Sequence, residues 1–338
     1  MNPPAVLSVT PLTTPWRGAD PFLFMAHHLD LYPRGDGRLG PAAPLHGRQI
    51  GSDFAGIDGW NLYHGERVPG FPAHPHRGFE TITIVAEGYV DHSDSLGGRA
   101  RYGMGDVQWL TTGRGVMHSE MFPLLHADRP NTLNLMQIWL NLPAASKMAP
   151  PHFTMFWAER IPVTDTDGGA RVRVIAGRLG DVEPLPPPPD SWAARPDAHV
   201  AVWLAHLPAG ASWTIPADVA GLTRSLHTVG AHPVEIDGHV LPVRHTAVVR
   251  SEVRLTVRNN GADDTLLLLL QARPIGEPVA QYGPFVMNTP QQLQQAFIDF
   301  QKTRFGDWPF ADGAPTHGDE AKRFAVFPDG REEQPGDH

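Results

Sequence analysis

Short runs of β-branched and aromatic residues, separated by glycine-containing turns, fill the chain from Phe79 to Leu140. Such runs are typical of strands, and close spacing of strands and turns is typical of an antiparallel meander or barrel. The turns are recognised at residues 94–98, 103–106 and 113–115, where glycines cluster. This part of the sequence therefore predicts one β-barrel domain.

A second block of strand-like segments, of similar density, extends from residue 171 to residue 272. After it, Thr289 followed by Pro290 and Gln292 forms a helix-capping signature before an apolar run, and Gly306 is expected to end that helix. We predict an all-β fold of two barrels with a short C-terminal helix. The expected domains are residues 1–163, residues 164–288, and residues 289–338 as the helix and a partly disordered polar tail.

Composition narrows the classes of function. The 338 residues include 27 Lys and Arg against 36 Asp and Glu, which gives a formal net charge of −9, and there is no cysteine. Thiolate metal sites and disulfides are thereby excluded, and the acidic balance disfavours a nucleic-acid surface. Apolar runs such as Leu266–Leu270 are far shorter than the roughly 20 residues that span a bilayer. The N-terminus lacks a signal-peptide pattern, and we expect a cytoplasmic monomer that binds neither nucleic acid nor membrane.

Two short motifs carry candidate metal ligands. His74 and His76 are two residues apart, so on an extended strand both imidazoles face the same way. His118 and Glu120 repeat this spacing. One such pair occurs by chance in a chain with 18 histidines, but two pairs on neighbouring strands would bring together three imidazoles and one carboxylate. A ligand set of this kind leaves coordination positions for water or substrate.

The sequence around these pairs resembles the two metal motifs of the pirin family, which are bicupins. The resemblance rests on residues 71–81 and 105–121, and it continues in residues 20–22, 137–142 and 277–289. It implies a double cupin whose N-terminal barrel holds one divalent metal ion through His74, His76, His118 and Glu120, and whose C-terminal barrel has lost its site. Iron is the common metal of the family, although this donor set also accepts Mn, Ni, Co, Cu or Zn.

Ordinary cupins often take the glutamate ligand from their first motif, where Glu80 stands in this chain. Glu120 is favoured here because it shares a face with His118. Glu80 lies an even number of residues from His76, so it stays open as an alternative ligand or as a partner that orients a histidine.

The resemblance also implies an activity, because some pirins resemble quercetin 2,3-dioxygenases. In that mechanism the metal binds the 3-hydroxyl of a flavonol, Glu120 accepts the proton, and dioxygen opens the ring with release of carbon monoxide. We therefore expect a small aromatic substrate and O2. Four apolar residues that flank the ligands are predicted to line a flat aromatic pocket, although each also suits a barrel core: Phe71, Phe79, Trp109 and Met136.

The resemblance supports a second function of a different class, because pirin relatives also act as iron-containing redox sensors that bind a transcription factor or a metabolic enzyme without turnover. One departure from the family is also present. Pro21 and His74 are 53 positions apart, more than in the shortest family members. This inserted segment is expected either to cap the metal pocket or to pad the outside of the barrel.

Overall fold

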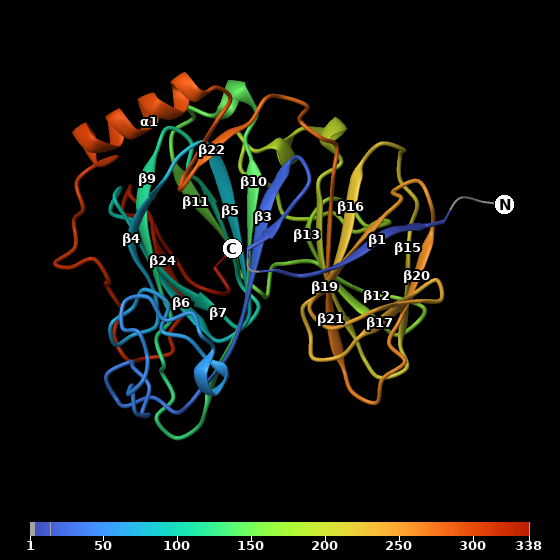
Figure 1. The fold of residues 1–338 in the computed structure, drawn as a ribbon, viewed down its shortest axis with the longest axis horizontal. Coiled ribbons are helices and arrows are strands. Elements are labelled where there is room, and N and C mark those ends of the chain that lie inside the picture. The colour runs from blue at the N-terminus through green and yellow to red at the C-terminus, as the bar shows by residue number, and fades with distance from the viewer. Residues whose placement is uncertain (1–3, 14, 338) are drawn as a thin grey trace. The chain divides into compact units, whose positions relative to one another are not determined.

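The computed structural model describes residues 4–13 and 15–337, and it consists mainly of antiparallel strands (Figure 1). The chain forms two compact units. The first barrel comprises residues 27–159 and 277–337, and the second barrel comprises residues 4–13, 15–26 and 160–276. Each unit contains a two-sheet β-barrel, which confirms the predicted all-β double cupin with one C-terminal helix.

Two six-stranded sheets carry the first barrel, and strand β3 leads the chain into it from the other unit. One sheet has the order β11 (His152–Phe156), β8 (Val107–Thr111), β5 (Phe79–Glu87), β10 (Asn131–Asn141), β3 (Phe22–Tyr32) and β2 (Trp16–Arg17). The other has the order β25 (Glu332–Glu333), β24 (Phe324–Val326), β7 (Arg99–Gly103), β6 (Tyr89–Asp94), β9 (Val116–Met121) and β4 (Gly70–His76).

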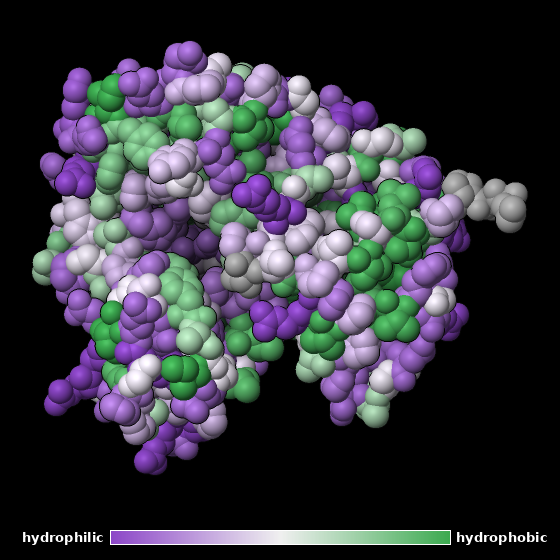
Figure 2. Space-filling view, viewed as in Figure 1, coloured by the Kyte–Doolittle hydropathy of each residue, from purple (hydrophilic) through white to green (hydrophobic). Residues whose placement is uncertain are grey.

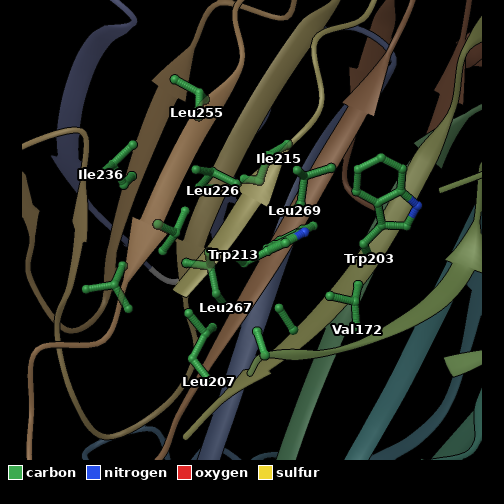
Figure 3. Packing of buried hydrophobic residues seen from close by; sticks show 14 of the residues in the cluster. Val172, Trp203, Leu207, Trp213, Ile215, Leu226, Ile236, Leu255, Leu267 and Leu269 are labelled. Atoms are coloured by element: carbon green, nitrogen blue, oxygen red, sulfur yellow. The ribbon is translucent and has the colours of Figure 1, made fainter. Parts of the chain in front are cut away.

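The second barrel pairs a seven-stranded sheet with a four-stranded sheet. The larger has the order β1 (Val6–Pro11), β19 (His245–Val249), β16 (Thr223–Thr228), β21 (Thr265–Ala272), β14 (Ala201–Leu207), β13 (Arg171–Ala176) and β12 (Val163–Asp165). The smaller has the order β15 (Ser212–Ile215), β20 (Leu255–Arg258), β17 (Val234–Ile236) and β18 (His239–Leu241). Figure 3 shows side chains of both sheets, including Trp203, Trp213 and Leu269, packed into one apolar core.

The N-terminal residues differ from the expected domain allocation. Strand β1 pairs with β19, and Val9 lies opposite Ala247, so the beginning of the chain completes the second barrel. A six-residue strand can pair with any free sheet edge, and its sequence does not specify which one.

The C-terminal helix matches its prediction. Helix α1 spans Pro290–Thr303, and the Thr289 side chain accepts a hydrogen bond from the Gln292 backbone in a capping box. It follows the short hairpin of β22 (Ala280–Tyr282) and β23 (Phe285–Met287). The remaining helices are single 3-10 turns: Ile57–Gly59, Ala144–Ser146, Trp192–Ala194 and Pro196–Ala198. Across the described residues, no helix has the length and apolar character needed to cross a membrane.

The polar tail is more ordered than its composition predicts. Strand β24 pairs with β7, and the Phe327 ring stacks on Phe153 with a centroid distance of 4.8 Å. Ala325 is fully buried in the core of the first barrel. The expectation of disorder is wrong over this stretch because four apolar residues, 324–327, suffice to add an edge strand to an existing sheet.

Candidate metal centre

Strands β4 and β9 bring the two predicted histidine motifs together. They pair antiparallel, with His74 directly opposite His118 and His76 opposite Val116. Strand β4 lies at the edge of its sheet, which tolerates the prolines at positions 72 and 75 because an edge strand leaves one row of N–H groups unpaired. The ligand nitrogens of His74, His76 and His118 all lie within 4.8 Å of one another.

Burial keeps these imidazoles neutral, which is the form that binds a metal. It lowers the pKa of His74 to about 4 and the pKa values of His76 and His118 well below their usual range. The Nδ1–H of His74 donates to the Pro72 carbonyl at 2.9 Å, which leaves Nε2 available as a ligand.

The donor set fits a metal ion. Both ring nitrogens of His118 are buried and have no hydrogen-bond partner among the described residues. A buried imidazole without partners is costly, and a metal ion would satisfy the Nε2 lone pair. Within residues 4–13 and 15–337, this is the single cluster of three or more His, Asp or Glu side chains whose ligand atoms converge. The second barrel therefore shows no such cluster in the part of the chain that the structure describes.

Glu120 lies beside the three imidazoles. Its Oε2 is 3.9 Å from Nε2 of His118. The side-chain amide of Gln137 on β10 donates to both carboxylate oxygens at 2.9 Å, and the Thr83 hydroxyl on β5 lies 3.4 Å from Oε1. Burial raises the pKa of Glu120, while the hydrogen bond from Gln137 opposes that shift. The carboxylate is thus oriented by hydrogen bonds from two strands of the opposite sheet.

Gln137 and Thr83 were not among the site residues predicted from the sequence. They lie opposite each other on β10 and β5, and both contact Glu120. The signal in the sequence that could have indicated them is a polar residue at a barrel-facing position of β10 and of β5. It could not be recognised without knowing which strand face is internal.

A further imidazole beside the cluster, the buried His92 on β6, was also missed. Its ring centroid is 5.6 Å from that of His118, and it lies opposite Glu120 in the β6–β9 register. Its Nε2 is 3.0 Å from Oδ2 of Asp94, whose Oδ1 accepts backbone hydrogen bonds from Leu96 and Gly98. The i, i+2 spacing of His92 and Asp94 is the one signal that the sequence offered.

Glu80 lies on the strand face that points away from the histidine cluster. Successive side chains of a strand alternate between its faces, and the site-facing residue of β5 is Thr83, three positions from Glu80. Glu80 therefore points to the opposite face, where the Thr111 hydroxyl donates to it at 2.7 Å. Its even spacing from His76 did not place the two on one face because they belong to different strands, β4 and β5.

Two of the four predicted pocket residues lie near the histidines. The Phe79 ring is 5.1 Å from His76, and the Phe71 ring is 6.4 Å from His74. Trp139, which was not predicted, lies 5.1 Å from His76 and stacks on Phe79 at 4.0 Å. The site therefore has a flat apolar wall of two stacked rings.

The other two pocket predictions are wrong. Trp109 lies opposite Ile82 and Met136 opposite Ile84, so both occupy the strand face that points away from Thr83 and the site. Both side chains are fully buried. They are packing residues outside the metal pocket.

Two β-barrels, with a histidine cluster between strands of one of them, define the chain as a bicupin with a candidate metal centre. The pirin model matches residues 45–140, and the model of the pirin C-terminal cupin domain matches residues 202–306. The chain belongs to the pirin family.

Individual relatives support this assignment. A pirin-like protein of Caulobacter vibrioides is 39% identical over 70% of this chain and 80% of its own length. Human pirin is 33% identical over 72% of this chain and 80% of its own. A Pseudomonas aeruginosa protein, named provisionally as a quercetin 2,3-dioxygenase, is 37% identical over 69% of this chain and 79% of its own.

Among solved structures, quercetin 2,3-dioxygenase from Acinetobacter baumannii superimposes with a TM-score of 0.66. The two proteins are 29% identical, and the match covers 85% of this chain and 86% of the other.

Proposed function

We propose that this protein is a metal-dependent dioxygenase that cleaves flavonols such as quercetin at the 2,3-bond and releases carbon monoxide. The observation that carries the proposal is the position of Glu120, a buried carboxylate of raised pKa, 3.9 Å from one of three convergent neutral imidazoles. The names of the Pseudomonas and Acinetobacter relatives support it.

His74, His76 and His118 would hold one divalent metal ion, with iron the first candidate, and Glu120 would complete the set. When bound, the ion supplies a Lewis acid that lowers the pKa of the substrate 3-hydroxyl and a centre for dioxygen chemistry. Glu120 accepts the hydroxyl proton, and its raised pKa brings its basicity closer to neutral pH. Gln137 keeps the carboxylate aimed at this proton through its two hydrogen bonds.

The stacked rings of Phe79 and Trp139 beside His76 provide a surface for the planar substrate. The rings offer stacking contacts to the planar substrate and keep water from this side of the site, while the metal ion, when bound, would offset the cost of the negative charge on the deprotonated flavonol. The proposed mechanism requires no protein partner. The monomeric state and the cytoplasmic location stay predictions.

The test is aerobic turnover of quercetin by protein loaded separately with Fe, Mn, Ni, Co, Cu or Zn. Loss of flavonol absorbance and release of carbon monoxide are measured. We expect turnover with at least one metal, and we expect His118→Ala to abolish it. His206→Ala, a half-exposed histidine of the second barrel, is the matched control and should retain full activity. Stoichiometric metal binding without consumption of any flavonol would contradict the proposal and favour the regulatory alternative.

A further inference from the structure

The inserted segment, defined here as residues 33–69 between β3 and β4, is anchored to the first barrel through a small set of buried residues. Trp60 and Leu62 are buried in the core of the first barrel. A buried ion pair of 2.8 Å joins Arg48 and Asp53, and the Arg48 guanidinium lies 3.2 Å from the centre of the Trp60 ring. Arg48 also donates to two backbone carbonyls of the segment. These contacts fix its shape.

Tyr63 connects this segment to the metal site. Its hydroxyl donates to Oδ2 of Asp30 at 2.7 Å and accepts from Nδ1 of His28 at 2.8 Å, so the ring is anchored to β3. The ring stacks on Phe71 with a centroid distance of 5.0 Å and an interplanar angle of 29°. Phe71 in turn is 6.4 Å from the candidate ligand His74.

Two more aromatic rings continue this surface. His64 contacts the edge of Phe71 at 5.8 Å, and its Nδ1 donates to the Gly51 carbonyl at 2.9 Å. Phe54, which is 53% exposed, covers both Tyr63 at 5.5 Å and His64 at 5.0 Å. The backbone of Tyr63 has a φ of 59°, a left-handed conformation that a bulky residue rarely adopts. Such strain is retained where the surrounding contacts enforce it.

The rings lie on the side of the one histidine of the cluster that is partly exposed. His76 and His118 are buried, whereas His74 is partly exposed. Figure 2 shows a hollow lined by hydrophilic residues over the first barrel, with the lobe of the inserted segment below it. A ligand that approaches through His74 therefore passes Phe71 and the rings that support it.

We propose that the inserted segment forms a fixed aromatic wall at the mouth of the metal site, in which Tyr63 and Phe54 hold Phe71 and His64 in place. The wall admits a flat ring system to the metal edge-first and excludes substrates that carry bulky substituents on that ring system. Of the two roles expected for the segment, this assigns it the cap and not padding. The limit on substrate shape rests on the proposed function, whereas the limit on access to the metal does not.

Access is tested directly by the rate at which 1,10-phenanthroline, a flat three-ring chelator, removes the bound metal ion. We expect Phe54→Ala and Tyr63→Leu to speed removal by about tenfold, equivalent to a lowered barrier of about 1.4 kcal/mol. Ile50→Ala changes a half-exposed residue of the same segment that is not part of the wall, and this control should match the wild type. Phe54→Ala removes a surface ring and leaves the core intact, so the test stands even where Tyr63→Leu does not fold.

Rates within about twofold of the wild type for both wall variants would overturn the proposal, because that change corresponds to only about 0.4 kcal/mol. If no ion binds, the same variants are compared without metal by the rate of His74 modification with diethyl pyrocarbonate. Phe54→Ala and Tyr63→Leu should again react faster than the wild type, and rates within about twofold of the wild type for both would again overturn the proposal.

Substrate shape is then measured as kcat/KM for quercetin and for a flavonol that carries a sugar at position 7. The wall variants should raise the relative value for the glycosylated flavonol, and an unchanged ratio contradicts the specificity role. If no flavonol is consumed by any variant, the proposed function fails, while the removal rates still decide whether the wall controls access.

Discussion

His74 on β4 and His118 on β9 lie directly opposite each other in an antiparallel pair, and their ring centroids are 4.4 Å apart. Since His76 follows two residues after His74 on the same strand face, this single cross-strand register determines the whole imidazole cluster. A one-residue slip of β4 against β9 would remove it.

The first prediction concerns metal binding. His118→Ala removes the most deeply buried of the three imidazoles and should lower the affinity for a divalent metal by at least about 100-fold. Isothermal titration and metal analysis after dialysis measure this. His206→Ala serves as the control, and tight stoichiometric binding by His118→Ala would show that the cluster is not the metal site.

The second prediction concerns the orientation of Glu120. In the wild type, the hydrogen bonds from the Gln137 amide lower the pKa of Glu120, and Gln137→Leu removes both of them. Their loss should raise that pKa, reduce kcat by about tenfold to 100-fold, and move the acidic limb of the pH–rate profile to higher pH. Gln281→Leu changes an exposed glutamine of the same unit and should leave the profile in place. An unmoved acidic limb in Gln137→Leu would mean that Glu120 is not the base.

The third prediction concerns acid stability. Burial lowers the pKa of His28 from 6.5 to about 3. Below pH 6.5 the unfolded chain therefore takes up a proton that the folded chain does not, so this group makes the free energy of unfolding fall as pH falls, by up to about 1.4 kcal/mol per pH unit.

The neighbouring Asp30 acts in the opposite direction, because burial raises its pKa to about 6 and the folded state binds a proton first. The His28 contribution is therefore isolated by comparing variants. Urea unfolding between pH 7 and pH 4 should give a flatter pH dependence for His28→Leu than for the wild type. Parallel curves would show that His28 titrates normally in the folded protein.

The fourth prediction concerns the C-terminal strand. Phe327 is buried and stacks on Phe153, so Phe327→Ala should lower the free energy of unfolding of the first barrel by about 3 kcal/mol. Met148→Ala, which changes an exposed residue of the same barrel, should cost less than about 0.5 kcal/mol. Equal effects of the two changes would mean that β24 does not pack on the barrel in solution.

The sequence by itself determined the elements whose signals are local. Runs of β-branched and aromatic residues between glycine turns indicated the strands, and the residues from Thr289 to Gln292 indicated the start of α1. The i, i+2 spacing placed His74 with His76, and His118 with Glu120, on shared strand faces. Each of these signals operates within a few residues of chain, where backbone geometry alone decides which side chains share a face.

Only the tertiary structure decided which face of each strand is internal. In β5, Glu80, Ile82 and Ile84 are as deeply buried as Phe79 and Thr83. Both faces of the strand are therefore buried, and an alternation of apolar and polar residues could not show which face is internal. For that reason Trp109 and Met136 were wrongly predicted to line the pocket. Gln137 and Trp139, which are one and three positions after Met136 on β10, were not predicted.

The long-range contacts were likewise beyond the reach of sequence patterns. The pairing of β1 with β19 and of β24 with β7 joins distant segments through backbone hydrogen bonds. The hydrogen bonds of Tyr63 with His28 and Asp30 do the same through side chains. Such contacts are specific to a three-dimensional register, and many sequences would satisfy them, so their residues carry no distinctive local mark.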